Sequence, residues 1–453
     1  MEPAVSNGRL EVSCGNKIPK STPCPRPVPG EASGGCSFDG AQITLIPIAD
    51  AAHLVHGPIA CLGNSWESRG SLSSGPELSA YGFTTDLGEQ DIIFGSEQKL
   101  HESIRYIVSR FAPPAVFVYS TCVTALTGED IEGVCKAESE RLGTPIIPVN
   151  SPGFVGSKNL GTRLAGDVLF QHIIGSTEPE QTTSHDINLI GEYNIAGEMW
   201  HIERLMQQAG MSILSRITGD GRFREVGWAH RAKANMVVCS RALLGLAVQM
   251  ERKYGIPYFE GSFYGAKETS YSLRQMAYLT GDRDVERRVD KLAAREEMRL
   301  SLELEPYRKQ LKGKRAVLYT GGVKSWSVIT ALQELGIKVV GVGTNKSTAE
   351  DVSRIADRIG DDAEYIPEGG ARQILKTVRS RKADMVIAGG RNMYMALKEQ
   401  IPFVDINQER HKAYAGYNGL LSLAKQLVHT LQHPVWELTA KPAPWEEETE
   451  FAD

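Results

Sequence analysis

The hydrophobic pattern between residues 100 and 149 predicts a strand–helix–strand unit. One face of a predicted helix carries apolar side chains at helical spacing: Leu100, Ile104, Ile107, Val108 and Phe111. Pro113-Pro114 ends this helix before an apolar run, residues 115–120, that is typical of a buried strand. A second helix, at about 130–141, leads into a strand at 145–149. Two strands joined through a helix favour a parallel sheet.

The join between helix and strand recurs along the chain. Four predicted helices end in a glycine that directly precedes a strand: Gly143, Gly210, Gly255 and Gly336. A related join without the glycine precedes residues 402–407. The intervals are unequal, so this is a reused junction and not a repeat of fixed period. It indicates several open, doubly wound sheets in series.

The pattern divides the chain into three α/β domains. We predict domains at 36–185, 186–310 and 311–435, preceded by an extended N-terminal arm (1–35) and followed by an acidic tail (436–453). The strands expected in the second and third sheets are 187–191, 212–218, 235–240, 257–261, 316–321, 338–343, 363–367, 385–390 and 402–407. A charged helix at about 282–309 joins the two. The arm is rich in proline, and its Cys14 and Cys24 are interpreted as exposed thiols.

Composition narrows the class of protein. The 453 residues are 41% hydrophobic and 23% charged, with a formal net charge of −5, which describes a globular chain without the basic surface that nucleic acid requires. The longest apolar stretch, residues 44–63, contains Asp50, His53 and His56 and does not suit a membrane span. The first residues do not form a secretion signal, so we expect a cytoplasmic protein. In the reducing cytoplasm, the seven cysteines of the chain are expected to be free thiols or metal ligands and not disulfides.

Common catalytic motifs are absent from the sequence. It contains no GxxxxGK[ST] loop, no HExxH pair and no GxSxG elbow, and its glycine-rich strand ends lack the GxGxxG spacing. The acidic segment 129–132 is best explained as the start of a helix, where negative charge is favourable.

Three cysteines share a setting. Cys36 and Cys61 lie in glycine-containing segments that we predict to be loops, and Cys122 follows the predicted strand 115–120. We hypothesise that all three are ligands of one inorganic cluster. The alternative is that each is an ordinary buried thiol, which is how we interpret Cys135 in the middle of a predicted helix.

A second group of candidates lies where strands of the second and third sheets should end. It comprises Cys239, Lys324, Arg391 and Asn407, the cations accompanied by glycine pairs. Ligands of open parallel sheets bind at the carboxyl ends of the strands. A thiolate, two cations, glycine amides and a carboxamide suit an anionic ligand with a thiophilic part. For Cys239 a buried thiol in a sheet is the alternative.

Several segments resemble the nitrogenase component superfamily, and within it the subunits that build the cofactor. They are GGCSFDGA, VHGPIACLGNSW, VFVYSTCVTALTGEDIEGVCK and IPFVDIN, and the resemblance extends from about residue 34 to 435. It implies three Rossmann-like domains and an α₂β₂ heterotetramer with a homologous NifN-like subunit. It also implies that Cys36, Cys61 and Cys122 hold an interface iron–sulfur cluster of 4Fe-4S type, to which the partner adds a cysteine.

The resemblance also assigns a precursor site. Cys239 matches the cysteine that binds the terminal iron of the cofactor, and Asn407 stands where the catalytic subunit has a molybdenum-ligating histidine. Thr162 replaces a histidine of the catalytic subunit and Lys158 replaces a glutamine. The residues implied to neutralise the precursor and homocitrate are Arg69, Lys158, Lys324 and Arg391. In the alternative interpretation these cations form salt bridges.

The resemblance therefore implies a scaffold that holds an iron–sulfur precursor while molybdenum and homocitrate are inserted. Its implied partners are the nitrogenase iron protein, a NifB-like precursor donor and apo nitrogenase component 1 as acceptor. Two alternatives stay open: the catalytic alpha subunit of a nitrogenase or related reductase, and a cluster-free Rossmann-type enzyme or solute-binding protein.

Overall fold

The computed structural model describes residues 35–66, 70–238, 240–345, 347–360, 363–367 and 369–439, and the side chains of 64–66, 240–242 and 439 are not described. The predicted arm, apart from Gly35, and most of the predicted acidic tail lie outside these residues. So do four residues singled out from the sequence: Cys14, Cys24, Arg69 and Cys239.

The first sheet is parallel and has the strand order β2-β1-β3-β4. Its strands are β1 Ala52–His56, β2 Phe83–Thr84, β3 Val116–Ser120 and β4 Ile146–Val149. The α-helices of this part are α1 Ser37–Leu45, α2 Ile59–Trp66, α3 Glu89–Phe94, α4 Glu97–Phe111, α5 Cys122–Thr127, α6 Ile131–Leu142 and α7 Lys158–Val168. Short helical turns are η1 Leu78–Ala80, η2 Gly153–Val155 and η3 Leu169–Ile173.

The second sheet is also parallel, in the order β6-β5-β7-β8. Its strands are β5 Asp186–Glu192, β6 Ser212–Thr218, β7 Ala234–Val237 and β8 Tyr258–Glu260. Its helices are α8 Glu198–Ala209, α9 Phe223–Gly227, η4 Trp228–Arg231, α10 Ser240–Tyr254 and α11 Ala266–Thr280. The 29-residue helix α12 Arg283–Leu311 leads to the third sheet.

The third sheet has the order β11-β10-β9-β12-β13, again with parallel neighbours. Its strands are β9 Arg315–Tyr319, β10 Lys338–Gly343, β11 Glu364–Ile366, β12 Met385–Ala388 and β13 Phe403–Asp405. Its helices are α13 Val323–Glu334, α14 Ala349–Ala356, α15 Ala371–Ser380, η5 Gly390–Asn392, α16 Met393–Lys398, α17 Gly416–Leu431 and α18 Val435–Thr439. The predicted α/β fold with three doubly wound parallel sheets is therefore confirmed.

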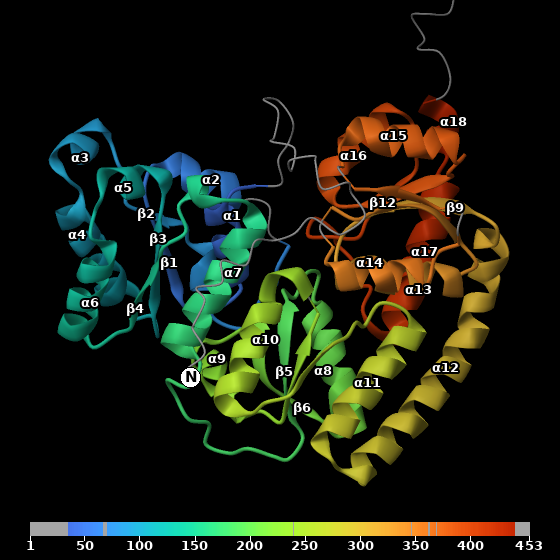
Figure 1. Cartoon of the computed structure of the whole chain (residues 1–453), viewed down its shortest axis with the longest axis horizontal. Helices are drawn as coiled ribbons and strands as arrows, with labels where there is room; N and C mark the ends of the chain where they lie inside the picture. The colour runs from blue at the N-terminus through green and yellow to red at the C-terminus, as the bar shows by residue number, and fades with distance from the viewer. Residues whose placement is uncertain are drawn as a thin grey trace, which may run out of the picture.

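The three sheets surround a shared centre. In Figure 1 the first sheet (blue to teal) lies at the left, the second (green) at the bottom and the third (orange to red) at the upper right, with α12 along the right-hand side. One hydrophobic core continues from the first sheet to the second, because Val55 and Phe117 belong to the same buried cluster as Ile190 and Val237. The predicted domain boundaries remain predictions.

The predicted elements agree with the structure in type and differ at their ends. The four glycines expected to end helices all have φ between 66° and 82°, the left-handed conformation that glycine adopts without strain. β7 ends at Val237 and β13 at Asp405, so Asn407 lies beyond its strand and not at its last position. The acidic segment does begin a helix, since the Asp130 side chain accepts from Gly133 N and caps α6.

His53 in β1 makes stability depend on pH. Its side chain is fully buried, and burial lowers the pKa to about 4 from 6.5. Below pH 6.5 the His53 side chain is therefore protonated in the unfolded chain but stays neutral in the folded chain. The free energy of unfolding falls as pH drops from 6.5 towards 4. We expect a loss of about 2 kcal/mol between pH 6.5 and about pH 5, at about 1.4 kcal/mol per pKa unit. Denaturant unfolding of wild type and His53→Gln checks this, since the loss should be smaller in the variant.

Candidate functional site

Two of the three candidate cysteines follow adjacent strands. Cys61 comes after β1 and Cys122 after β3, and these strands pair in register with His56 opposite Ser120. The chain order reverses between β1 and β3, which makes their carboxyl ends a topological switch point, the usual ligand position of an open α/β sheet. Cys36 does not follow a strand of this sheet; it is the N-cap residue of α1.

The predicted loop around Cys61 is wrong. Cys61 lies in the first turn of α2, and its N–H donates to the carbonyl of Pro58 at 3.0 Å. A proline directly before a helix is tolerated, because the first N–H groups have no partner inside the helix. Gly63 is not needed for a close approach either, since a Cβ there would meet no other atom within 4 Å.

The structure brings the three thiols together. A Cβ added to Gly153 would lie 3.0 Å from Cys122 Sγ and 3.2 Å from Cys36 Sγ, so both sulfurs pack closely against this glycine and a side chain here would crowd them. Burial raises the pKa of Cys61, and the neighbouring Cys122 and Cys36 raise it further. All three are partly exposed, whereas Cys135 is buried in α6 as predicted.

Exposed apolar side chains surround these thiols. Ile59 on α2 is 59% exposed, Leu126 on α5 is 76% exposed, and Phe154 beside Gly153 is 57% exposed. Phe94 on α3, which packs beside α5, is 85% exposed. Exposed apolar side chains on several neighbouring segments are typical of a contact with another protein. The thiols therefore lie at a surface suited to a partner and not in the interior.

Among the described residues, no group of three or more His, Cys, Asp or Glu side chains is arranged to hold a single metal ion. A lone ion requires its ligands to converge to about 2.0–2.3 Å from one point. An iron–sulfur cluster places each thiolate on a separate iron and needs wider spacing. Three partly exposed thiols, two of which pack against the backbone of Gly153 and not against a side chain, fit a cluster better than a single ion.

A cavity of about 310 Å³ opens where the second and third sheets end. Its lining includes four of the six predicted cofactor-binding residues: Lys158, Lys324, Arg391 and Asn407. Thr162 lines it as well, and so does Val238, the residue before Cys239. Both glycine pairs are present, Gly321-Gly322 after β9 and Gly389-Gly390 after β12, at the switch point of the third sheet. No histidine is among the described residues that line the cavity.

Carboxylates offset the cations of the cavity. Lys158 Nζ lies 3.4 Å from the carboxylate of Asp39, and Lys324 Nζ donates to the carbonyl of Ile406 at 3.3 Å. Glu192 lines the cavity, and burial together with the charge of Glu198 raises its pKa to about 7. The cavity is therefore less positive than the sequence suggested, and the salt-bridge interpretation applies to Lys158.

Sequence reasoning missed a buried ion pair at the cavity floor. Arg410 forms a salt bridge with Glu198, and Tyr264 donates to the same carboxylate at 2.9 Å. The Arg410 guanidinium also donates to the carbonyl of Asn407, which fixes the segment after β13. Glu192 could have been predicted from the rule that ligands bind at the carboxyl ends of parallel strands, because it is the last residue of β5. For Arg410 the sequence offered no signal.

Helices α1 and α7 connect the thiols with the cavity. Cys36 caps α1, while Lys158, Asn159 and Thr162 of α7 line the cavity. A Cβ on Gly40 would lie 1.9 Å from the carbonyl oxygen of Lys158, so the two backbones are in direct contact. The close contact requires glycine, and it places Cys36 and Lys158 at the same end of this pair of helices, where Cys36 also pairs with Ser157.

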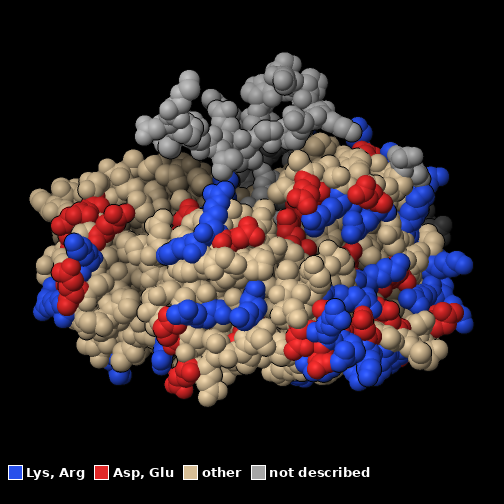
Figure 2. Space-filling model, turned by 60° about the horizontal axis from the view of Figure 1, so that its bottom comes forward, with Lys and Arg blue, Asp and Glu red and all other residues tan. Residues whose placement is uncertain are grey.

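The surface itself carries mixed charge. On the face shown in Figure 2, acidic and basic side chains alternate and no basic stripe is visible. Among the described residues, no helix is both long and apolar enough to cross a membrane.

Comparison with known proteins decides the family. The profile of the family described as nitrogenase component 1 type oxidoreductase matches residues 36–432. The chain belongs to this family. The resemblance inferred from the sequence motifs is thus confirmed. Its closer similarity to cofactor-assembly members is confirmed by relatives named NifE.

Curated relatives and a solved structure agree with this assignment. The nitrogenase iron-molybdenum cofactor biosynthesis protein NifE of Nostoc sp. is 58% identical over 93% of this chain and 88% of its own length. NifE of Klebsiella pneumoniae is 53% identical over 96% of this chain and 97% of its own. A structure of nitrogenase Cp1 at pH 5 superposes with a TM-score of 0.85 at 28% identity, covering 95% of this chain and 94% of that chain.

Proposed function

We propose that the chain is a scaffold subunit that holds an iron–sulfur precursor while molybdenum and homocitrate are inserted to complete the iron–molybdenum cofactor. The observation that carries this proposal is the ligand chemistry of the cavity. Its described lining offers Asn407 and Thr162 but no imidazole. A carboxamide is a weaker ligand than imidazole for transition metals. With Cys239 as its one strong ligand, the iron–sulfur precursor is held firmly at one end only, so it can be released.

The interface cluster is the second part of the proposal. Cys36, Cys61 and Cys122 would supply three thiolates of a 4Fe-4S cluster, and a NifN-like partner the fourth ligand. When bound, such a cluster supplies one-electron redox chemistry and a covalent link between subunits. The nearness of Cys36 and Cys122 at Gly153 and the exposed apolar side chains Ile59, Leu126 and Phe154 support a site completed by a second chain in an α₂β₂ heterotetramer.

The cations of the cavity would select an anionic cargo. Lys324 and Arg391 come from two neighbouring strand ends of the third sheet, and Lys158, which is paired with Asp39, adds a cation from α7. Arg69 is assigned the same role on the strength of the sequence motif alone. Such charges attract a polyanion such as homocitrate.

The names of the relatives support a place in cofactor assembly. We place this assembly in the cytoplasm, as the sequence predicts. In this pathway a NifB-like protein donates the precursor, the nitrogenase iron protein assists its maturation, and apo nitrogenase component 1 accepts the product. On this proposal the chain is a maturation scaffold and does not itself reduce dinitrogen.

A direct test is anaerobic copurification with the NifN-like subunit, followed by iron analysis and a visible spectrum. We expect a brown complex that transfers its cargo to apo component 1. A colourless complex without iron would instead favour a cluster-free Rossmann-type protein. The similarity to nitrogenase Cp1 keeps a catalytic alpha subunit as the second candidate. Acetylene reduction by the complex with the iron protein would establish that alternative.

Asn407→His should make the cavity retain the cofactor that the wild-type chain releases. An imidazole at this position gives the cargo a second strong ligand, so release to apo component 1 should slow by at least about tenfold, the effect of some 1.4 kcal/mol. Measuring molybdenum transfer over time checks this. Asn392→His is the matched control, because Asn392 also lines the cavity but follows β12. Equal slowing in both variants would contradict a specific ligand position at 407.

A further inference from the structure

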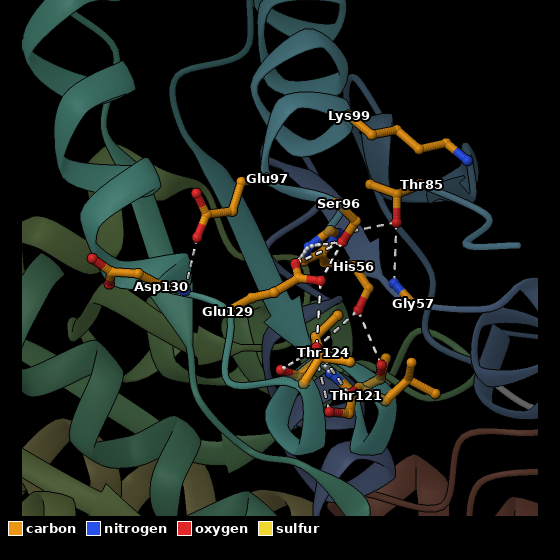
Figure 3. A network of polar contacts seen from close by, with 12 residues as sticks. His56, Gly57, Thr85, Ser96, Glu97, Lys99, Thr121, Thr124, Glu129 and Asp130 are labelled. Atoms are coloured by element: carbon orange, nitrogen blue, oxygen red, sulfur yellow. Dashed lines mark hydrogen bonds and ion pairs between the residues drawn. The ribbon is translucent and has the colours of Figure 1, made fainter. Parts of the chain in front are cut away.

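A buried network of polar side chains lies at the end of β1, the strand that Cys61 follows (Figure 3). His56 is fully buried, and its Nε2 lies 2.7 Å from a carboxylate oxygen of Glu129. Ser96 Oγ donates to the same carboxylate at 2.6 Å, and His56 Nδ1 lies 3.0 Å from Thr85 Oγ1. An imidazole with its proton on Nε2 satisfies these partners, because Thr85 can donate to Nδ1 and accept from Gly57 N at 3.1 Å.

The geometry excludes a hydrolytic triad. In such a triad the nucleophile and the acid meet opposite nitrogens of the imidazole. Here Ser96 and Glu129 both meet Nε2, and Ser96 is buried away from any substrate. The network must therefore be structural or act through its neighbours.

Its neighbours are the two segments that carry Cys61 and Cys122. Thr121 Oγ1 donates to the carbonyl of His56 at 3.0 Å, which joins the end of β1 to the start of α5. A Cβ on Gly57 would lie 2.4 Å from Thr121 Oγ1, so the two segments are in close contact. Pro58, whose carbonyl receives the Cys61 N–H, follows directly. Each cysteine is thus attached to the network by a short, rigid piece of backbone.

We propose that the His56–Glu129 network is a positioning site that fixes the spacing of the Cys61 and Cys122 thiols for the interface cluster. Glu129 reaches it from the segment before α6 and Ser96 from the N-terminus of α4, so the network anchors the thiol-bearing turns to the helical layer behind them. The inference rests on the proposed cluster function. Residues behind metal ligands commonly change metal affinity by about 10–100-fold when replaced.

The chain contains a matched control. Glu138 on α6 accepts from His101 Nδ1 at 2.6 Å and from Arg105 Nη2 at 2.6 Å, both on α4. This is also a buried carboxylate that pairs with a histidine and joins the same two helices. Within the part of the chain that the structure describes, no hydrogen bond or ion pair joins Glu138 to a segment that carries a cluster cysteine. Glu138→Gln therefore reproduces the loss of a His–Glu pair without the positioning effect.

The test uses the anaerobic complex with its partner subunit, prepared without the precursor donor so that only the interface cluster contributes iron. The release of iron to a ferrous chelator is monitored through the loss of the cluster's visible absorbance. The midpoint potential of the cluster is measured separately. Glu129→Gln should release iron at least about tenfold faster than wild type and shift the potential. Glu138→Gln should match wild type in both.

Equal iron release from Glu129→Gln and Glu138→Gln overturns the positioning role. If Glu129→Gln does not fold, the rate of iron release from Thr121→Val tests the proposal instead, because this variant removes only the hydroxyl that donates to the His56 carbonyl. Faster release from Thr121→Val supports the proposal, and release at the wild-type rate overturns it. A wild-type complex without iron would refute the cluster function itself, which is a different result.

Discussion

Replacing Cys61 with alanine is expected to remove most of the interface iron from the complex, while Cys239→Ala leaves that iron in place and weakens retention of the precursor. The reason is that the two cysteines serve different sites. Cys61 belongs to the group with Cys36 and Cys122, whereas Cys239 directly follows Val238, which lines the cavity. Iron analysis of the anaerobic complexes, with and without the precursor donor, checks both expectations.

Cys135→Ala is the control for the loss of a thiol as such. Cys135 is buried in α6 and has no place in the group at Gly153. Its replacement should leave both pools of iron unchanged. Loss of the same iron from Cys61→Ala and Cys239→Ala would contradict the assignment of two separate sites.

Gly161→Ala is expected to destabilise the chain by about 3 kcal/mol or more, the upper range for overpacking. Its Cβ would lie 1.8 Å from the carbonyl oxygen of Ser37, and a backbone atom cannot rotate away. Because Cys36 is the N-cap residue of α1 and α7 carries Lys158, separating the helices should disturb the thiol group and the cavity together. Denaturant unfolding and iron content measure the two effects.

Gly245→Ala provides the comparison. Gly245 lies in α10, and a Cβ there would meet no other atom within 4 Å. Alanine in an open helical position should raise stability by up to about 1 kcal/mol. A Gly161→Ala chain as stable as wild type would show that α1 and α7 can move apart at little cost.

The candidate sites were predictable to different degrees. The strand-end rule located Lys324, Arg391 and Asn407, because glycine-rich ends of parallel strands can be recognised from local sequence. It did not locate Arg410, whose role depends on meeting Glu198 from another sheet. Nor did it place Cys61 in a helix, because glycine and proline near a helix start resemble a loop in sequence.

The His56–Glu129 pair illustrates the limit most clearly. These residues are 73 positions apart, and the acidic segment was explained adequately by the start of α6. The capping explanation was correct for Asp130 and incomplete for Glu129. Only the folded chain brings the carboxylate to a buried imidazole.

By itself the sequence determined the alternation of strands and helices, the helix-ending glycines, the doubly wound fold and the motifs that mark the family. These follow from local periodicity and from backbone conformations that few residues adopt. The tertiary structure alone decided that Cys36 and Cys122 meet at Gly153 with Cys61 nearby, that carboxylates offset the cavity's cations, and that two glycines let α1 and α7 touch. Such contacts depend on which strands become neighbours and how closely helices pack, and no local pattern encodes that.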